Sequence, residues 1–305
     1  MKLLAAAGAS IVLTFAKPAL PPGGLPTAGT RDFTPSAETA DATGSAETAP
    51  ASGSSSFASI LSSVEFNERF GKFDACFVLK SLDDGWTLRY NEPRCVTRFS
   101  PCSTFKIPNA LAGMDCGFLR GADHEMKWDG TSQNRKECER DHTLDTAIRD
   151  SVMWYFQRVA AGVGAERMQK YLDALQYGNR DMSGGLTKFW LQTSLEISAD
   201  EQVRFLENLY TGKLPFDARA VETVKGLIVF KKGDGWTLSG KTGTGGKGGK
   251  SMEAILGWYV GHVHSGDRQY VFAVNASGDG AMGPKVRAIT IEILRKVGLT
   301  PSTSQ

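Results

Sequence analysis

The sequence predicts an α+β protein in which an antiparallel sheet with flanking helices carries an inserted all-helical domain. Strand patterns occur at residues 75–90 and return after about residue 226, whereas residues 103 to about 225 show helical and loop patterns. Strands, a helical block, further strands and a terminal helix together indicate one sheet with an insertion. A cleft between the two parts is where we expect a ligand to bind.

The strands are predicted from runs of apolar, β-branched and aromatic residues that end at turn signals. The first pair covers residues 75–80 and 86–90, joined by a turn at Asp83, Asp84 and Gly85. Four more strands follow the helical block, at residues 226–230, 235–241, 255–263 and 270–275.

Two helices carry clear signals. Ser198 as N-cap, with Glu201 three residues later, forms a capping box at the start of an apolar-periodic segment. The last helix ends at Gly298, where glycine is favoured. Its predicted apolar face consists of Val286, Ile289, Ile293, Leu294 and Val297.

The N-terminal residues predict export. Met1 and Lys2 precede an apolar run, residues 3–16, which has the length of a signal-peptide core and is short for a membrane span. We therefore expect residues 1–19 to be a signal peptide, with cleavage after Ala16 or Ala28, or an uncleaved anchor, as alternatives. The protein should then be periplasmic or secreted, with no stable membrane insertion after cleavage.

A linker and one large domain should follow. Residues 20–56 are rich in Pro, Gly, Ser, Thr and Ala, and carry too little apolar surface to offset the entropy of ordering. We expect them to form a flexible linker and residues 57–300 to form the catalytic domain.

Composition argues against nucleic acid and metal ions as partners. The net charge is +2, and no run of Lys or Arg would follow a phosphate backbone. The four His residues form no metal-binding motif, and the Cys spacing matches no zinc site. An oxidising compartment would permit one disulfide, and the odd number of thiols leaves at least one free among Cys76, Cys95, Cys102, Cys116 and Cys138.

The first motif that carries chemistry is Ser103-Thr-Phe-Lys106. On a helix, Ser103 and Lys106 lie three residues apart on one face. A serine hydroxyl needs a base to become a nucleophile, and burial can lower the pKa of a lysine enough for it to serve. By itself, this four-residue pattern is equally consistent with an ordinary helix start.

The second motif, Lys241-Thr242-Gly243, follows the predicted strand at 235–241. A cation and a hydroxyl on such a strand can hold a substrate carboxylate, and serine enzymes that recognise penicillin pair these two motifs. Residues 235–242 also satisfy the G-x-x-x-x-G-K-[ST] pattern of a nucleotide-binding loop. That loop must open a helix, and the glycine-rich residues 243–249 argue against one.

Five segments, taken together, resemble the class D, or oxacillinase, serine β-lactamases. The similarity runs from about Val64 to Val297, nearly the whole globular domain. It implies the penicillin-recognising serine enzyme fold and the hydrolysis of β-lactam antibiotics, penicillins above all. The segments are RFSPCSTFKIPN (98–109), YGNRDMSGG (177–185), KFWL (188–191), ISADEQ (197–202) and KTG (241–243).

The resemblance implies four catalytic residues. Ser103 would form the acyl-enzyme, and Lys106 would take up CO2 to become N6-carboxylysine, the base for acylation and deacylation. CO2 or bicarbonate is then the only cofactor that we expect. Trp190 would donate a hydrogen bond to the carbamate, although its sequence context alone favours a core aromatic residue. Ser151 would relay a proton to the departing ring nitrogen.

The resemblance also implies a substrate-binding set. Lys241 and Arg287 would bind the substrate carboxylate, although Arg287 alone is typical of a solvated helix charge. The backbone N–H groups of Ser103 and Thr244 would form the oxyanion hole. The full binding set is Lys241, Thr242, Gly243, Thr244 and Arg287.

Three further positions should shape the site. Tyr177 and Asn179 belong to the Tyr-Gly-Asn element of the family. Met153 stands where the Ser-x-Val element of the family has valine, so we expect a bulkier side chain near the lysine. The glycine-rich run after Thr244 should form a mobile loop, and Cys102 should be a buried residue rather than the nucleophile.

Two other functions share these motifs. A penicillin-binding protein or β-lactam sensor would be acylated without turnover, and a cell-wall-binding module would not react at all. The intact Ser103, Lys106 and Lys241 argue against the binding module. A sensor of this type is normally attached to a membrane protease with several transmembrane helices, and the sequence shows neither such helices nor the H-E-x-x-H motif of a metalloprotease. A monomer and a homodimer are both compatible with the sequence.

Overall fold

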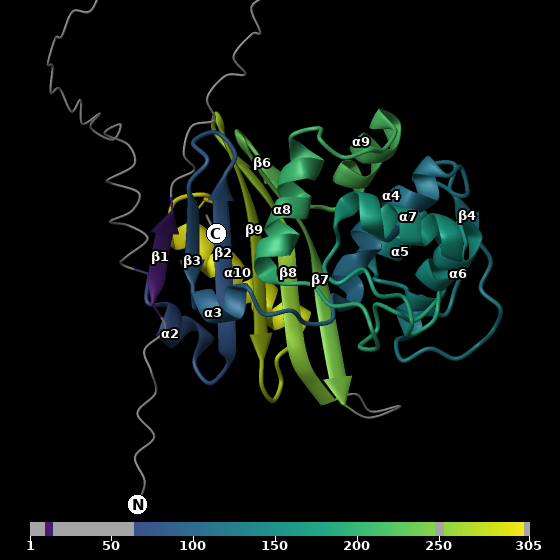
Figure 1. The fold of residues 1–305 in the computed structure, drawn as a ribbon, viewed down its shortest axis with the longest axis horizontal. Coiled ribbons are helices and arrows are strands. Elements are labelled where there is room, and N and C mark those ends of the chain that lie inside the picture. The colour runs from purple at the N-terminus through teal and green to yellow at the C-terminus, as the bar shows by residue number, and fades with distance from the viewer. Residues whose placement is uncertain (1–9, 15–63, 248–252, 302–305) are drawn as a thin grey trace, which may run out of the picture.

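The computed structural model describes residues 10–14, 64–247 and 253–301. Within them, a seven-stranded antiparallel sheet has the order β1-β3-β2-β9-β8-β7-β6 (Figure 1). The predicted sheet with an inserted helical block is confirmed. The strands are β1 (Ile11–Thr14), β2 (Asp74–Ser81), β3 (Thr87–Tyr90), β6 (Val229–Gly233), β7 (Trp236–Lys247), β8 (Glu253–Ser265) and β9 (Arg268–Ser277), with a separate pair β4 (Glu125–Met126) and β5 (His142–Thr143).

The helices form two groups. Helix α10 (Gly283–Lys296) covers one face of the sheet and α8 (Ala199–Tyr210) the other, while the remaining longer helices form a lobe beside β7 (Figure 1). That lobe contains α4 (Lys106–Asp115), α5 (Leu144–Arg149), α6 (Met153–Val163), α7 (Ala165–Leu175) and α9 (Ala218–Leu227). Shorter elements are α2 (Phe66–Phe70), α3 (Glu92–Cys95) and the 3-10 turns η1 (Cys102–Phe105) and η2 (Lys136–Cys138).

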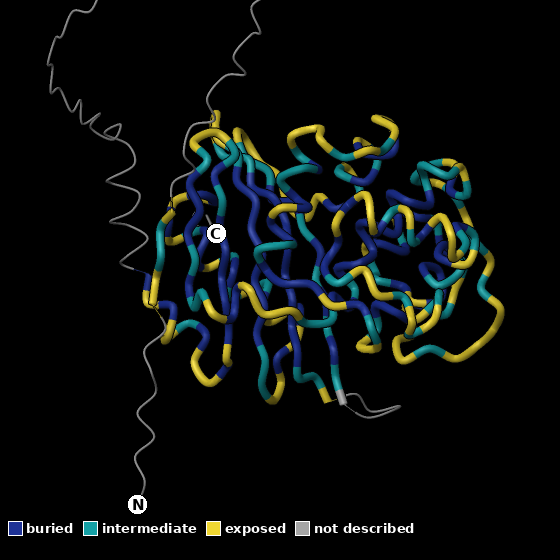
Figure 2. Tube along the Cα trace, in the orientation of Figure 1, coloured by how far each residue is buried: buried dark blue, intermediate teal, exposed yellow. Residues whose placement is uncertain are grey.

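Side chains of the central strands point alternately to the two faces of the sheet and so contribute to two cores. On β2, Phe77 and Leu79 pack toward α10, whereas Val78 packs toward α8 and the helical lobe. Both faces of the central strands are therefore buried, as Figure 2 shows in dark blue. The lobe shares its core with the α8 face of the sheet, and this shared core fixes the lobe against β7.

The predicted helix ends are confirmed. Ser198 Oγ accepts a hydrogen bond from Glu201 N, and the Glu201 carboxylate accepts one from Ser198 N, so the capping box starts α8. Helix α10 packs its predicted apolar face on the sheet, and Gly298, just beyond its end, has φ of +77°.

Two predicted strands have different bounds in the structure. The strand expected at 226–230 is Val229–Gly233, because α9 continues through Leu227. The strand expected to end at Lys241 continues to Lys247, so the first part of the glycine-rich run is a strand rather than a loop. The long ladder with β8 explains this, since it pairs Thr244 with Gly257 and continues past a bulge.

The N-terminal strand β1 lies within the segment expected to be a signal peptide. Ile11–Thr14 pairs with β3 at the edge of the sheet. Signal cleavage stays a prediction, and the linker expected at 20–56 lies outside the described residues. Among the residues that the structure describes, no helix is both long enough and apolar enough to cross a membrane.

Candidate active site

The nucleophile candidate and its base lie at the start of the helical lobe. Ser103 is in η1 and Lys106 is the first residue of α4, so the two side chains come from consecutive turns. Lys106 Nζ and Ser103 Oγ are 2.7 Å apart. This distance is within the range required for direct proton transfer.

Burial adapts the Lys106 amine to act as a base. The side chain is 1% exposed, and no carboxylate of the described residues lies within 4.0 Å of its nitrogen. Desolvation, helped by the positive charge of Arg135, lowers the pKa of Lys106 to about 7. At neutral pH about half of the amines are uncharged and can accept a proton from Ser103.

A second lysine, Lys241, lies within hydrogen-bond distance of a second serine, Ser151. Lys241 Nζ of β7 donates to Ser151 Oγ at 3.0 Å and to its neighbour Thr242 O at 3.1 Å. Burial, followed by the charges of Lys106 and Arg135, lowers the pKa of Lys241 well below its ordinary value. The site therefore holds two buried lysines, each beside one serine hydroxyl.

Ser151 occupies a backbone position that normally favours glycine. It follows the end of α5 with φ of +56°, in the left-handed region. Val152 N donates to Ala147 O at 2.9 Å and Ser151 N to Ile148 O at 3.3 Å, which makes this turn a Schellman motif. A left-handed non-glycine residue costs roughly 1–2 kcal/mol, so the hydroxyl is placed here against the backbone preference.

Close packing holds η1 against β7. A Cβ atom on Gly243 would lie 2.9 Å from Pro101 O and 3.2 Å from the Thr104 methyl group, too close for any larger residue. Thr244 Oγ1 accepts a hydrogen bond from Gly283 N at 2.9 Å, which ties β7 to α10. The glycine of Lys241-Thr-Gly243 therefore sets the separation between the nucleophile turn and the strand.

Trp190 carries an unused hydrogen-bond donor beside Phe105, the residue that precedes Lys106. Its indole is completely buried, stacks on Phe105 with ring centres 5.3 Å apart, and its Nε1 has no hydrogen-bond partner. Ser100 holds the Trp190 backbone, because its hydroxyl donates to Trp190 O at 3.0 Å and its carbonyl accepts from Trp258 Nε1. A buried N–H group without a partner is uncommon and costly, so this donor is suited to an acceptor that the protein itself does not supply.

Comparison with known proteins decides the family. The penicillin-binding protein transpeptidase domain family matches residues 43–296. The probable β-lactamase YbxI of Bacillus subtilis is 40% identical over 79% of this chain and 88% of its own length. The crystal structure of a class D β-lactamase from Bacillus subtilis covers 79% of this chain and 99% of its own, with 40% identity and a TM-score of 0.73. The chain belongs to the class D serine β-lactamases.

A sensor is also among the relatives of this class D enzyme. The regulatory protein BlaR1 of Bacillus licheniformis is 36% identical over 79% of this chain, which corresponds to 40% of BlaR1. The same fold thus occurs as one part of a longer regulatory protein.

Tyr177 and Asn179 of the class D element support the site without reaching the reacting atoms. Tyr177 OH donates to Gln202 Oε1 at 3.3 Å, and Gln202 Nε2 donates to Thr104 Oγ1 at 2.9 Å, beside Ser103. Asn179 Nδ2 donates to Ser194 O, and its Oδ1 accepts from two backbone N–H groups of the loop that carries Trp190. Both residues hold neighbouring segments in place, and their role in shaping the site stays a prediction.

Two predicted residues lie farther from the reacting pair. Met153, at the start of α6, is 42% exposed, so its thioether is at the surface while Lys106 is buried. Arg287 on α10 is half-buried, and its guanidinium stacks over Phe230 at 4.4 Å. The positive charge of Arg287 contributes to lowering the pKa of Lys241, so this arginine acts electrostatically on the site.

Sequence reasoning missed four contributors to this site. Ser100 and Gln202 lie inside recognised motifs, but their hydrogen bonds join segments about 90 residues or more apart. Gln192 accepts from Gly246 N at 2.7 Å and so fixes the far end of β7. Arg135, in a loop without any motif, acts on both buried lysines.

The environment of Cys102 argues against this thiol as the nucleophile. All five thiols are free in the structure. Cys102, beside Ser103, is buried, and burial raises the pKa of its thiol to about 11. At neutral pH it is a protonated, inaccessible thiol, as the sequence predicted.

The nucleotide-binding loop suggested by residues 235–242 is excluded, because Trp236–Lys247 is a continuous strand and no helix begins there.

A cavity of about 480 Å³ borders the site framework rather than the nucleophile. Ser100 and Gln192 lie in its wall, together with the far ends of β8 and β9. Neither Ser103 nor either of the two buried lysines lines it. Ser103 and the two buried lysines lie instead where η1 and the start of α4 pack beside β7.

We expect Gly243→Ala to lower the acylation rate at least tenfold, because the new methyl group must push η1 and Ser103 away from β7. The measurement is acylation of the purified variant by a penicillin in stopped flow. Gly226→Ala is the matched control, since a Cβ there meets nothing within 4 Å and α9 tolerates alanine. Equal rates for the two variants would contradict this account of β7.

We expect activity to fall as the pH drops through about 7. The lowered pKa of Lys106 means that its neutral form predominates above about pH 7 and the inactive ammonium below it. kcat/KM should therefore decrease about tenfold per pH unit on the acid side. A pH profile of penicillin hydrolysis checks this, and a flat profile down to pH 5 would show that the base is not a lysine with this pKa.

Proposed function

We propose that this class D enzyme hydrolyses β-lactam antibiotics, penicillins above all, through an acyl-enzyme on Ser103. The observation that carries the proposal is the Ser103–Lys106 pair at 2.7 Å, with the pKa of the lysine at about 7. A buried neutral amine in contact with a serine hydroxyl is a nucleophile and base prepared for acyl transfer.

In the proposed acylation, Ser103 Oγ gives its proton to Lys106 and attacks the lactam carbonyl carbon. The N–H groups of Ser103 and Thr244 hold the developing oxyanion, each worth roughly 3–4 kcal/mol in comparable enzymes. The C–N bond of the ring then breaks, and Ser151 passes a proton to the departing nitrogen. Lys241, which donates to Ser151 Oγ at 3.0 Å, orients that hydroxyl.

The substrate carboxylate is proposed to bind at the opposite end of the cleft. Lys241 supplies a buried amine that a bound carboxylate would stabilise in its charged form, and Thr242 and Thr244 carry hydroxyl groups along the same strand. Arg287 adds positive charge from α10, and its stacking on Phe230 restricts the guanidinium. A carboxylate bound at this end of the cleft would therefore meet two cations.

The residues also fit a carbamylated Lys106, the form in which this lysine would serve as the base in both acylation and deacylation. The neutral amine is the form that adds CO2, and Trp190 Nε1 is a buried donor without a partner in the protein. When bound, CO2 supplies a carboxylate-like base on the end of the lysine. Trp190 would then satisfy its indole N–H on that anion and keep it in place.

We also propose that the enzyme works outside the cytoplasm. The signal-like residues 1–19 and the linker-like composition of residues 20–56 support export to the periplasm or the medium. β-Lactam antibiotics act on cell-wall synthesis there, so an exported hydrolase would meet its substrate before the substrate reaches its target.

Mass spectrometry with a slowly hydrolysed penicillin tests the function directly. We expect one adduct on Ser103, complete turnover on longer incubation, and neither event in Ser103→Ala, which should retain its fold because only one small hydroxyl is lost. An adduct on Cys102 would overturn the assignment of the nucleophile. Stable acylation without turnover would favour the sensor function of BlaR1 instead.

We expect Arg287→Ala to raise KM more than it lowers kcat. The guanidinium binds the substrate carboxylate in the ground state and the transition state alike, through an interaction of roughly 1.5–3 kcal/mol. Steady-state kinetics on a penicillin give both constants. Lys285→Ala, which removes a cation from α10 that instead packs over Phe73, should leave KM unchanged. An unaltered KM in Arg287→Ala would remove this residue from the binding set.

We expect Trp190→Phe to show biphasic kinetics that added bicarbonate partly restores. The substitution keeps an aromatic ring against Phe105 but deletes the indole donor, so the carbamate is held less well. Lys106→Ala should gain nothing from bicarbonate. If thorough degassing at mildly acid pH leaves the wild-type rate undiminished and bicarbonate changes nothing, Lys106 acts as a free amine.

A further inference from the structure

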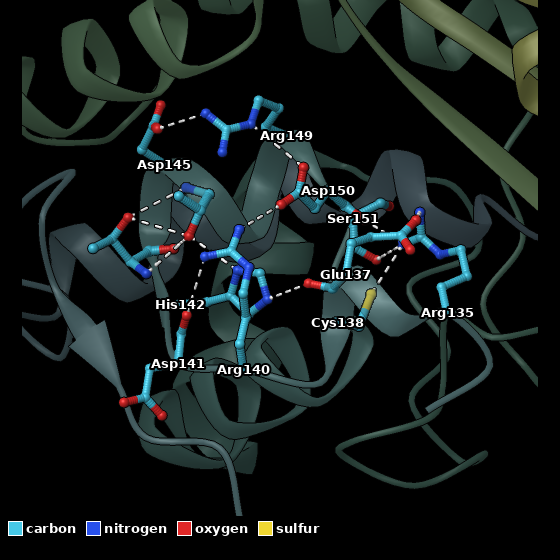
Figure 3. Close-up of polar contacts among 12 residues, drawn as sticks. Arg135, Glu137, Cys138, Arg140, Asp141, His142, Asp145, Arg149, Asp150 and Ser151 are labelled. Atoms are coloured by element: carbon cyan, nitrogen blue, oxygen red, sulfur yellow. Dashed lines mark hydrogen bonds and ion pairs between the residues drawn. The ribbon is translucent and has the colours of Figure 1, made fainter. Parts of the chain in front are cut away.

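Arg135 contacts the backbone of the turn that carries Ser151. Its Nη2 donates to Asp150 O, and Ser151 O lies 3.4 Å from the same nitrogen (Figure 3). These two carbonyl oxygens belong to the C-cap Asp150 and to Ser151, directly after the end of α5, where the helix itself provides no donor. The guanidinium thus supplies hydrogen bonds that the end of the helix lacks.

The segment that carries Arg135 is itself held firmly. His142, which is buried, has its Nε2 3.0 Å from Glu137 O and its Nδ1 3.0 Å from Thr146 Oγ1 (Figure 3). Trp154 Nε1 of α6 donates to Cys138 O at 2.9 Å. Turn η2 is therefore fixed to α5 and α6, and Arg135 extends from a rigid base rather than from a free loop.

Local contacts also direct the Arg135 side chain. Nη1 pairs with Glu137 Oε1 at 3.2 Å, and Nη2 lies 3.3 Å from Cys138 Sγ. Although the side chain is 47% exposed, its guanidinium is aimed at the Ser151 turn by groups on both sides. An arginine suits this task because its planar fork can serve several acceptors at once.

The Ser151 turn needs such support. Ser151 is in the left-handed region, which a serine adopts at a cost, and its hydroxyl must remain 3.0 Å from Lys241 Nζ. A small rotation of this turn would carry the hydroxyl away from the lysine. Hydrogen bonds to the carbonyl groups of Asp150 and Ser151, which lie on either side of the Ser151 Cα atom, restrict that rotation.

We propose that Arg135 is a positioning residue for Ser151: it clamps the Asp150–Ser151 carbonyl groups and so keeps the Ser151 hydroxyl on Lys241 during acylation. The proposal rests on the proposed proton relay through Ser151. It adds to the reaction a residue that contacts neither the substrate nor the nucleophile, and whose loop carries none of the motifs of the site.

Arg135→Met tests the clamp, with acylation by a penicillin followed in stopped flow. We expect the rate constant at saturation to fall about tenfold, because charged hydrogen bonds to the turn are lost. The half-saturating concentration should change less than about twofold, since the substrate-binding groups are untouched. Arg135→Lys, which keeps the charge and one donor, should recover part of the rate.

Arg140→Met is the matched control. Arg140 is 49% exposed and also bonds to Asp150, but through the carboxylate Oδ2 at 3.0 Å and not through the backbone (Figure 3). We expect it to acylate at the wild-type rate. Thermal melts of both variants check the fold, and Arg135→Gln replaces Arg135→Met if the latter does not fold.

The double variant separates positioning from other effects. The comparison is made at about pH 9, where Lys106 is mostly neutral, so that losing the Arg135 charge has little effect on the base. In a Ser151→Ala background, Arg135→Met should then cause no further loss, because the hydroxyl that it positions is gone. A full additional loss there, or a wild-type rate in the single variant Arg135→Met, would overturn the proposal. If Ser151→Ala acylates normally, the relay itself fails and the clamp with it. If Ser151→Ala is slow and Arg135→Met is not, only the clamp fails.

Discussion

The burial of the Lys106 amine without a neighbouring carboxylate is the constraint on which this site depends. Desolvation disfavours the ammonium, and the positive charge of Arg135 acts in the same direction. The surroundings that enforce the burial combine neighbouring and distant residues: the amine lies 5.6 Å from the centre of the Phe156 ring, and Phe105, next to Lys106 in sequence, stacks on Trp190. The folded core is thus what converts an ordinary basic side chain into a proton acceptor at neutral pH.

The rest of the site keeps its parts at the separations that this base needs. Gly243 lets β7 approach η1 closely. On the other side, two consecutive hydrogen bonds, from Tyr177 to Gln202 and from Gln202 to Thr104, hold Thr104 in place. The strained backbone of Ser151 belongs to the same set of constraints, because it brings a hydroxyl to Lys241 from the end of a helix. Strain at such a position persists only where the surrounding structure determines it fully.

The sequence predicted much of this, and the failures have physical reasons. Capping signals and alternating apolar residues located α8, α10 and the central strands, because those signals are local. The extension of β7 through its glycines was not predictable from propensity, since pairing with β8 and the Gln192 contact at Gly246 override it. Motifs gave the reacting residues and the shaping residues Tyr177 and Asn179.

What motifs could not give are contacts between distant segments. The Gln202–Thr104 hydrogen bond spans 98 positions, and Arg135 reaches the Ser151 turn from a loop whose composition is unremarkable. The left-handed conformation of Ser151 was equally hidden, because a serine there contradicts the usual preference for glycine. Such features follow from tertiary structure and become visible only in three dimensions.

The outer edge of β7 has a consequence for the solubility of the protein. Strand β6 pairs with only the first part of β7, so from Lys241 onward the described strand has β8 on one side and no strand on the other. An unpaired edge of this kind is a template on which any extended chain, including that of a misfolded neighbour, could add itself. Here η1 packs against the edge at Gly243, and both Lys241 and Gly243 are buried. The turn that carries the nucleophile therefore also covers the edge of the sheet and discourages aggregation between molecules.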